Sequence, residues 1–382
     1  MINKKIVFVD PYCPWDLESN VLDQLNGAAT HPFVDKIAVM PDVHLGYDLP
    51  IGGVALTRNV ISPSFVGFDI GCGVEYARLN IDADFFFKHN DPEFVRDEIF
   101  QQVNVGVGVE NSVAQRRRKK TSVIPFKSMS HDDDLTDAVQ SKAEKQIGTL
   151  GGGNHFIELG KSGRYGHLCL IVHSGSRKPG YMIAEYYQKK HGEYLNVFSH
   201  AGQNYIHDMR WALGFAHLNR AMIMNDVMQV LGFNDDWDTY YLLQHINEPH
   251  NYASMYETAH SELQRWVHRK GAINAEGGVL GVIPGDMSTG SYIVRGLGNP
   301  QFLDSASHGA GRAMSRSKAK KDLSMEDFRE IVEGSEVSAM VDEKRLDESP
   351  MAYKDLENVI SPQDGTTIEI VDHIQPVVNV KG

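Results

Sequence analysis

Short apolar runs and longer helical repeats succeed one another along this chain, and together they predict a mixed architecture. Residues 74–81 roughly alternate apolar with polar side chains, as a strand with one buried face does. Residues 203–231 place apolar side chains such as Met209 and Leu213 near helical spacing, which predicts a long helix with a buried face. The other predicted strands cover residues 5–9, 37–40, 50–56, 156–159 and 168–172. The other predicted helices cover residues 16–26, 91–103, 137–147 and 179–194.

The stretch from residue 110 to residue 134 follows neither pattern and predicts a mobile loop. It is mostly polar and contains five consecutive basic residues at 116–120 and three aspartates at 132–134. Elsewhere no internal repeat, low-complexity tract or break in composition divides the chain. We therefore expect residues 1–382 to form a single large α+β domain.

One glycine-rich stretch carries residues that can do chemistry. Residues 67–74 place a carboxylate, Asp69, and a thiol, Cys72, three positions apart among three glycines. Glycine admits backbone conformations closed to other residues, so the two side chains can point at one spot. A thiolate and a carboxylate together with imidazoles suit a borderline ion such as Mn, Zn or Co better than Mg. The alternative is a glycine-rich turn with a buried free cysteine.

Four histidines recur in similar small or polar surroundings further along the chain. They are His155, His173, His250 and His308. Any one of them alone is more often a structural histidine that is bonded to the backbone. Four such histidines together with Asp69 and Cys72 favour a metal site. Asp42 and His44 follow the apolar run at 37–40, and we expect them to support the site from behind its ligands.

Composition and charge narrow the class of protein. With 382 residues, 42% hydrophobic and 23% charged, the chain has an ordinary globular composition. Its formal net charge of −13 excludes a protein that coats nucleic acid by bulk electrostatics, so a nucleic-acid site needs a local basic patch. One such cluster is the run at 116–120, and a second comprises Arg316, Lys318, Lys320 and Lys321. We favour the second because it directly follows the His308 segment, although either could be a solvated face.

The cysteine count and the absence of long apolar stretches bear on location. No run of about eighteen apolar residues could span a bilayer, and the first residues lead into a strand without a signal-peptide pattern. Cys13, Cys72 and Cys169 are odd in number and form no CxxC pair, which favours reduced thiols. We therefore expect a cytoplasmic protein in which Cys72 is free to bind metal.

An ordered set of motifs resembles the RtcB family of RNA ligases. The matching segments are residues 40–47, 69–73, 247–252, 283–288, 307–312, 350–355 and 380–382. Members of this family use GTP and manganese to join an RNA 3′-phosphate or 2′,3′-cyclic phosphate end to a 5′-hydroxyl end. The resemblance covers nearly the whole chain in the right order. It implies an α+β fold with mixed and antiparallel sheets around a central metal cleft.

The resemblance also implies the residues of the site. The expected ligands of two Mn²⁺ ions, with Cys72 as the bridge, are Asp69, Cys72, His155, His173 and His250. His308 is the expected nucleophile that takes GMP from GTP, and Asn154 and Arg312 are expected to bind phosphate oxygens. The expected contacts of the guanine base are Phe156, Glu158, Lys381 and, more weakly, Ser288 and Ser291. Asp286, and the residues 304–306 ahead of His308, depart from the family pattern but leave these positions intact.

The implied function is RNA ligation in RNA repair or tRNA splicing. The enzyme would open a cyclic end to a 3′-phosphate, load GMP on His308, transfer it to that phosphate, and let a 5′-hydroxyl displace GMP. Its partners would be RNA and GTP; we expect a monomer, and the need for an accessory protein stays open. One alternative is a di-metal phosphoesterase that acts without GTP. Another is an inactive RNA-binding subunit, against which the complete set of ligands argues.

Overall fold

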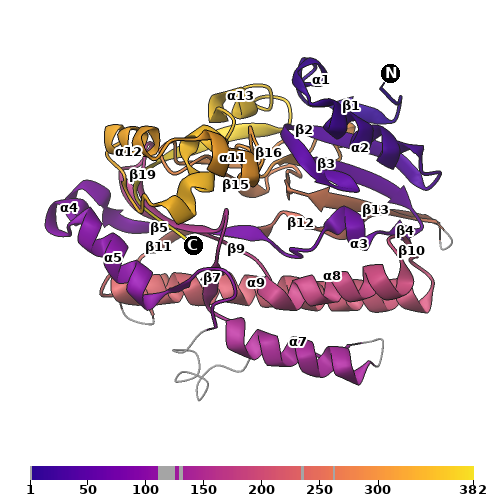
Figure 1. The fold of residues 1–382 in the computed structure, drawn as a ribbon, viewed down its shortest axis with the longest axis horizontal. Helices are drawn as coiled ribbons and strands as arrows, with labels where there is room; N and C mark the ends of the chain where they lie inside the picture. The colour runs from indigo at the N-terminus through magenta and orange to yellow at the C-terminus, as the bar shows by residue number, and fades with distance from the viewer. Residues whose placement is uncertain (1, 111–124, 129–131, 234–235, 261–262) are drawn as a thin grey trace.

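The largest sheet among the described residues forms the centre of the molecule (Figure 1). The protein is represented by a computed structural model that describes residues 2–110, 125–128, 132–233, 236–260 and 263–382. The strands of this sheet, in spatial order, are β11 (Leu242–Pro249), β5 (Gly73–Asp82), β9 (His167–Ser174), β8 (Phe156–Ser162), β19 (Ile368–Lys381), β16 (Ser291–Gly296) and β15 (Leu280–Pro284). These neighbours are all antiparallel, and the short β18 (Ser338–Ala339) adds a parallel partner to β19.

A second sheet of five strands holds the amino-terminal part of the chain. Its order is β1 (Ile6–Phe8), β2 (Val34–Tyr47), β3 (Leu49–Arg58), β13 (Leu263–Lys270) and β12 (Asn251–His260). β1 and β2 run parallel, and the other pairs are antiparallel. Each of these two sheets has one parallel pair among its antiparallel pairs, and helices pack against them. The predicted α+β class with mixed sheets is therefore confirmed.

Three helices pack in succession beneath the larger sheet (Figure 1). The long α9 (His200–Val230) contacts β5 and β9, α8 (Arg177–His191) lies against α9, and α7 (Asp133–Gln146) lies against α8. Met224 and Val227 of α9 are fully buried with Leu170 of β9 in one apolar cluster. The Met- and Ala-rich face that the sequence predicts for α9 is therefore core.

The remaining elements are shorter. Before β9 they are α1 (Cys13–Asp16), α2 (Ser19–Thr30), β4 (Val60–Ile61), α3 (Pro63–Val66), α4 (Ala83–His89), α5 (Pro92–Gln102), β6 (Asn104–Val105) and β7 (Thr149–Gly151). After β9 they are β10 (Leu195–Asn196), α10 (Trp237–Tyr240), β14 (Ala272–Asn274), β17 (Ser305–Ser307), α11 (Arg316–Asp322), α12 (Met325–Gly334) and α13 (Leu356–Ile360). Short 3₁₀ helices form at Pro300–Phe302, Glu343–Glu348 and Pro350–Ala352.

The predicted loop at 110–134 ends earlier than expected. Residues 111–124, with the basic run at 116–120, and residues 129–131 lie outside the described residues. Two of the three aspartates belong to α7, and the third, Asp132, caps it by accepting a hydrogen bond from the Leu135 backbone N–H at 3.0 Å. The predicted loop is wrong at this end because residues that cap a helix and fill its first turn are as polar as loop residues. No helix in the described part of the chain is long and apolar enough to cross a membrane.

Candidate metal centre and nucleophile

Four neighbouring strands of the larger sheet, β11, β5, β9 and β8, have one end each on the same side of the sheet. β5 begins at Gly73, which lies opposite Ser174 at the end of β9 and Pro249 at the end of β11. Phe156 opens β8 opposite His173. Because these strands pair antiparallel, the predicted ligands at their ends lie close together. These ligands are Cys72, His155, His173 and His250. The sequence shows these residues far apart, and the strand register is what brings them together.

The cluster has the geometry of metal ligands around Cys72. Its Sγ lies 3.4 Å from Nε2 of His155 and 3.3 Å from Nε2 of His173, and all three atoms lie within 4.8 Å of one another. On the other side of each ring, Nδ1 lies 2.9 Å from the Leu150 carbonyl and 3.1 Å from the Asn154 carbonyl, respectively. A carbonyl only accepts, so Nδ1 carries the proton and each Nε2 lone pair faces the cluster.

Burial and charge also fit a cation at this position. Burial lowers the pKa values of His173 and His250, which keeps both as the neutral imidazoles that bind metals. His250 Nδ1 is buried and has no hydrogen-bond partner among the described residues, a costly arrangement that a metal ion would relieve. Asp69 Oδ2 lies 3.3 Å from His155 Nε2. A thiol, imidazoles and a carboxylate form a donor set for a borderline divalent ion.

Burial raises the pKa of the Cys72 thiol. A cation at the centre would reverse this, because a coordinated cysteine is held as the thiolate. Cys72 is not in a disulfide, and neither are Cys13 and Cys169, as the sequence predicts.

A small sheet of two strands, β14 and β17, positions His308 next to the cluster. It follows β17, whose Ser307 pairs with Ala272 of β14, and the Ala272 backbone N–H donates to the His250 carbonyl at 3.1 Å. The rings of His308 and His250 then lie 4.8 Å apart between centroids. The predicted nucleophile thus lies next to the predicted ligands.

Asp42 orients His308 from behind. Its Oδ2 lies 2.7 Å from His308 Nδ1 and accepts the His308 backbone N–H at 3.1 Å. The register of β2 against β3 shifts between Val39 and His44, and this irregular segment presents the Asp42 side chain. Burial opposes ionisation of Asp42, yet the hydrogen bond and charge of His308 outweigh burial and lower its pKa. The carboxylate accepts the Nδ1 proton, which leaves Nε2 with the free lone pair that the predicted role of His308 requires.

Lys354 and His44 complete the support of Asp42. Lys354 Nζ donates to the carbonyls of Pro41 at 3.0 Å and Val43 at 2.7 Å, on either side of Asp42. His44 Nδ1 lies 2.9 Å from the Asp42 carbonyl, and burial lowers the pKa of His44 to about 4. His44 is therefore neutral at physiological pH, and the supporting role predicted for Asp42 and His44 agrees with this geometry.

Gly311 fixes the turn after His308, and its replacement should be costly. Its φ is +72°, and a Cβ there would lie 2.3 Å from the Asp42 carbonyl oxygen, a backbone atom that cannot rotate away. Gly365 has a similar φ of +73° but open space around a Cβ, so Gly365→Ala isolates the conformational cost of about 1–2 kcal/mol. We expect Gly311→Ala to lower the free energy of unfolding in urea by clearly more than Gly365→Ala. Equal losses would contradict this packing.

The predicted guanine contacts converge on the last strand of the chain. In the pairing of β19 with β8, Asn379 lies opposite Glu158 and Lys381 lies opposite Phe156. Glu158 accepts from Ser291 Oγ at 3.1 Å and from Asn379 Nδ2 at 3.3 Å. Lys381 Nζ lies 5.9 Å from the centroid of the Phe156 ring. The carboxy-terminal strand is docked as predicted, and Lys381 is 4% exposed.

A buried acidic centre next to Lys381 was missed by sequence reasoning. Glu348 Oε2 lies 3.0 Å from Lys381 Nζ, and Glu348 Oε1 lies 3.3 Å from Arg312 Nη1. Burial disfavours the charged carboxyl, but Lys381 and Arg316 lower the pKa of Glu348 to about 2. Tyr353 also donates to it. The only sequence signal is that Glu348 lies just before the 350–355 motif.

This centre changes the surroundings of Arg312. Its guanidinium donates to Glu348 and, at 2.6 Å, to the Asp347 carbonyl, while Nε donates to the Met314 carbonyl at 3.1 Å. Arg312 thus forms an ion pair with the buried carboxylate of Glu348, and its contact with phosphate stays a prediction. The Asn154 side chain, by contrast, has no hydrogen-bond partner among the described residues.

Ser288 lies in a turn that is held together by the Asp286 side chain. Its backbone N–H donates to Asp286 Oδ1 at 2.7 Å, and Thr289 Oγ1 donates to Asp286 Oδ2 at 3.1 Å. Asp286, the departure from the family pattern, therefore organises this turn. Of the two serines, Ser291 is the one that contacts Glu158.

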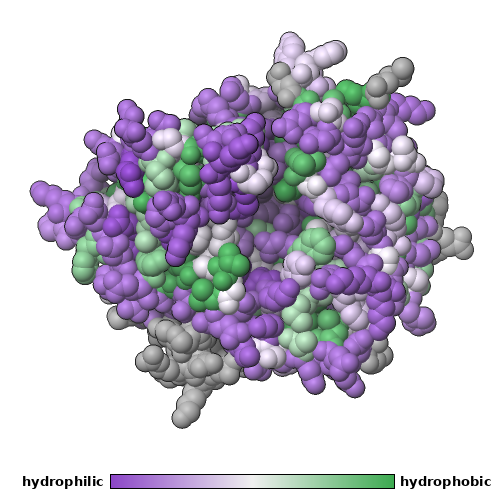
Figure 2. Space-filling view, in the orientation of Figure 1, coloured by the Kyte–Doolittle hydropathy of each residue, from purple (hydrophilic) through white to green (hydrophobic). Residues whose placement is uncertain are grey.

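The favoured basic cluster lies on α11. A Cβ on Gly153, next to Asn154, would lie 2.8 Å from the Arg316 guanidinium, so Arg316 covers the glycine-rich turn. Lys320 pairs with Asp347 at 3.3 Å, whereas Lys318 and Lys321 are exposed. In the space-filling view the face is hollowed near its middle, and mostly hydrophilic residues surround the hollow (Figure 2).

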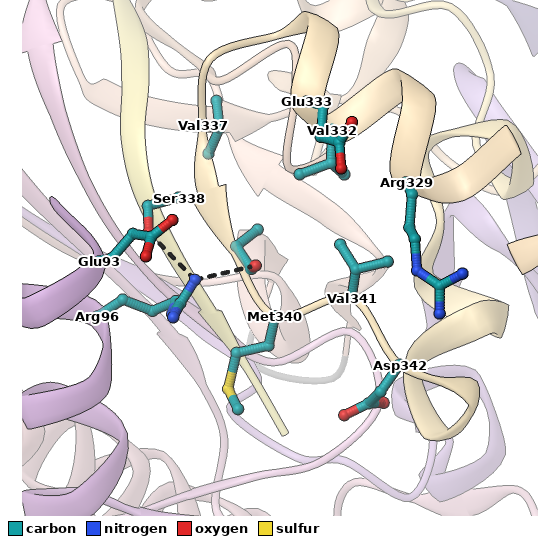
Figure 3. Close-up of a pocket in the computed structure, with 11 residues that line it drawn as sticks. Glu93, Arg96, Arg329, Val332, Glu333, Val337, Ser338, Met340, Val341 and Asp342 are labelled. Atoms are coloured by element: carbon teal, nitrogen blue, oxygen red, sulfur yellow. Dashed lines mark hydrogen bonds between the residues drawn. The ribbon is translucent and has the colours of Figure 1, made fainter. Parts of the chain in front are cut away.

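A separate cavity of about 430 Å³ lies between α5, α12 and β18 (Figure 3). Arg96 and Arg329 line it together with Glu93, Glu333 and Asp342, so its charges are mixed. Arg96 already donates to Ser338 Oγ at 3.4 Å. The cavity contains none of the predicted site residues.

A buried cluster of a cysteine and two histidines in an α+β fold suits a metal-dependent enzyme. A family model described as tRNA-splicing ligase RtcB matches residues 24–382, and the chain therefore belongs to the RtcB family. The RNA-splicing ligase RtcB of Escherichia coli strain K12 is 35% identical over 96% of this chain and 95% of its own. The tRNA-splicing ligase RtcB of Methanococcus maripaludis is 28% identical over 98% and 94%. The RNA-splicing ligase RtcB homolog 1 of Entamoeba dispar is 29% identical over 94% and 81%.

Proposed function

We propose that this protein is a GTP- and Mn²⁺-dependent RNA ligase, built as one catalytic domain, that joins 3′-phosphate or 2′,3′-cyclic phosphate ends to 5′-hydroxyl ends. The observation that carries the proposal is the position of His308: its Nδ1 lies 2.7 Å from Asp42 Oδ2, and its ring meets the ring of His250, a predicted metal ligand, edge to face with the centroids 4.8 Å apart. A nucleophilic imidazole next to a cation site suits nucleotidyl transfer. Membership of the family supports the same reaction.

The residues that would hold two Mn²⁺ ions are Asp69, Cys72, His155, His173 and His250, with the Cys72 thiol at the centre of the cluster. When bound, the ions neutralise phosphate charge and favour in-line attack. In the first step His308 Nε2 bonds to the α-phosphorus of GTP as the bond to pyrophosphate breaks, and Asp42 stabilises the charge on the ring. The RNA 3′-phosphate then takes GMP from His308, and a 5′-hydroxyl displaces GMP to form the phosphodiester. A cyclic end is first hydrolysed to the 3′-phosphate.

Glu158 is proposed to accept hydrogen bonds from guanine, with Phe156, Ser291 and Lys381 around the base and Asn154 and Arg312 toward the phosphates. Guanine presents N–H donors on the edge that a carboxylate can read. Lys381 Nζ is held by Glu348 at 3.0 Å, which fixes a cation on β19 opposite Phe156. These assignments explain why a strand at the end of the chain is buried.

GTP affinity should depend on the protonation of Glu158. Burial raises the pKa of Glu158 to about 8, so at neutral pH the carboxyl is largely protonated. Only the ionised form accepts both guanine donors, so binding must release this proton. We expect the ratio of wild-type to Glu158→Gln affinity, measured by calorimetry, to rise with pH up to about 8 and then level off, at about tenfold per pH unit in the steep part. The ratio cancels titration of the triphosphate. A ratio independent of pH would contradict the assignment.

The test of the proposed function is RNA joining in vitro. Purified protein with MnCl₂ and GTP should join an RNA ending in 3′-phosphate to one beginning with 5′-hydroxyl, and should fail when GTP is replaced by ATP. Release of phosphate from the same RNA without GTP would instead favour a di-metal phosphoesterase.

A further inference from the structure

Two neighbouring polar residues are buried on α9, whose other buried residues are mostly apolar. Asn219 is 0% exposed and Arg220 is 1% exposed, and neither is among the predicted site residues. An amide and a guanidinium are costly to bury unless their donors find acceptors. The helix contacts β5, β7, β9 and β11, and the metal-ligand cluster lies at the ends of three of these strands (Figure 1). The hydrogen bonds of this pair therefore bear on the metal centre.

Asn219 holds the glycine-rich turn that leads to His155. Its Oδ1 accepts the Gly148 N–H at 2.7 Å, and its Nδ2 donates to the Thr149 carbonyl at 3.1 Å. Gly148 has a φ of +71°, a conformation that other residues rarely adopt. Because the amide bonds to two consecutive residues, it fixes the direction in which the chain enters the turn.

A further bond from Asn219 leads to the His155 ring itself. Asn219 Nδ2 donates to Ser174 Oγ at 3.1 Å, and the Ser174 hydroxyl donates to the Leu150 carbonyl at 2.8 Å. The same carbonyl lies 2.9 Å from His155 Nδ1, so it orients the ring and fixes its tautomer. Ser174 directly follows His173 in the sequence. Asn219 therefore supports two of the predicted ligands at once.

Arg220 holds the segments of two other predicted ligands. Its Nη1 donates at 2.8 Å to the carbonyl of Gly71, which directly precedes Cys72. Its Nε donates at 2.7 Å to Asn247 Oδ1 on β11, the strand that ends just before His250. The planar guanidinium makes these bonds together because its donors point in fixed, divergent directions.

Two more contacts complete the connection. Arg220 Nη1 also donates to the Ser174 carbonyl at 3.0 Å, and Asn219 Nδ2 donates to the Gly175 carbonyl at 3.3 Å. A Cβ on Gly175 would lie 2.5 Å from Asp69 Oδ1, so this glycine packs directly against the Asp69 carboxylate. The pair thus bonds to the segment of each of the five predicted ligands.

We propose that Asn219 and Arg220 are positioning residues that set the geometry of the metal centre from α9. The inference rests on the proposed Mn²⁺-dependent function and deepens it, because it makes metal affinity depend on two residues that are not themselves ligands. Residues that orient metal ligands typically change metal affinity by about ten- to a hundredfold when they are removed.

A buried arginine on the other sheet provides the matched control. Arg269 of β13 is 2% exposed, and it donates to the Leu303 carbonyl at 3.2 Å and to the Asp304 carbonyl at 3.1 Å. Neither carbonyl belongs to a segment that carries a predicted metal ligand. Arg269→Met should therefore lower the free energy of unfolding, as Arg220→Met does, but leave metal affinity unchanged.

The test measures Mn²⁺ binding by calorimetry and Co²⁺ binding by absorbance, on variants whose folding is first checked by urea unfolding. A thiolate bound to Co²⁺ gives a charge-transfer band, which reports the bond to Cys72 without RNA or GTP. We expect Arg220→Met and Asn219→Ala each to weaken Mn²⁺ binding about tenfold or more, and Arg269→Met to bind as wild type does. The Co²⁺ band should change more in Arg220→Met than in Asn219→Ala, because Arg220 bonds directly beside Cys72.

Arg220→Lys decides the matter if Arg220→Met does not fold. It keeps the buried charge, but one ammonium cannot replace the fork of donors, so Mn²⁺ binding should again weaken about tenfold. An unchanged Mn²⁺ affinity and Co²⁺ spectrum in folded Arg220 variants would overturn the inference, and so would an equal loss of affinity in Arg269→Met. A wild-type protein that shows this metal pattern but joins no RNA would overturn the ligase function and leave the positioning role standing.

Discussion

His308→Ala should reduce RNA joining by at least about a thousandfold, because it removes the atom that is proposed to carry GMP. The fold should persist, since Asp42 is the one hydrogen-bond partner of the His308 side chain within the described part of the chain, and the turn is held by backbone bonds such as Ala310 N–H to the Pro284 carbonyl at 2.9 Å. The measurement is joining of a 3′-phosphate RNA to a 5′-hydroxyl RNA under single-turnover conditions.

A variant on the other side of the same hydrogen bond sharpens this prediction. Asp42→Asn keeps the size of the side chain but loses the charge that stabilises the ring, so we expect an intermediate rate. His373→Ala is the matched control, because His373 is a half-buried histidine of β19 outside the cluster: its Nε2 lies 2.9 Å from the Thr289 carbonyl, and its ring stacks on Tyr292. Joining by His308→Ala at a rate within tenfold of wild type would show that His308 is not the nucleophile.

Cys72→Ala should weaken Mn²⁺ binding by at least about a hundredfold and abolish activity with it, since Cys72 Sγ lies within 3.4 Å of two histidine nitrogens at the centre of the cluster. Removal of the thiol deprives the proposed ions of their shared ligand. The measurement is the stoichiometry and affinity of Mn²⁺ by calorimetry, followed by RNA joining at saturating Mn²⁺.

Cys169→Ala controls for the loss of any buried thiol. Cys169 is fully buried on β9, and its sulfur lies 3.6 Å from the Tyr76 hydroxyl rather than near the ligands. It should lose some stability by leaving a small cavity but bind Mn²⁺ as wild type does. If the two variants bind the metal equally well, Cys72 is a structural residue, and the glycine-rich turn is no more than a turn.

The sequence predicted most helices and strands because their patterns are local. The alternation over 74–81 corresponds to β5, and the helical spacing over 203–231 corresponds to α9. Boundaries were less accurate: α2 runs over Ser19–Thr30 rather than 16–26, because its amino end is set by Glu18 and has no side-chain cap to mark it.

The site was predictable in part. Small and polar neighbours single out Cys72 and the histidines, but their convergence depends on strand register, which no local pattern encodes. Glu348 escaped notice because an acid in a polar segment is usually solvated, and only the fold surrounds it with Lys381, Arg312 and Arg316. Arg316 was predicted to belong to a basic patch for nucleic acid. In the fold it forms ion pairs with Asp347 and Glu348 instead.

The central claim is that GMP becomes covalently attached to His308, and peptide mapping tests it most directly. The protein is incubated with MnCl₂ and α-labelled GTP, digested, and analysed by mass spectrometry, with His308→Ala and Cys72→Ala in parallel. We predict one GMP adduct, stable to base and labile to acid, on the peptide that contains His308, and none in either variant. A folded, Mn²⁺-loaded protein that carries no adduct, or carries it on another residue, would contradict the account.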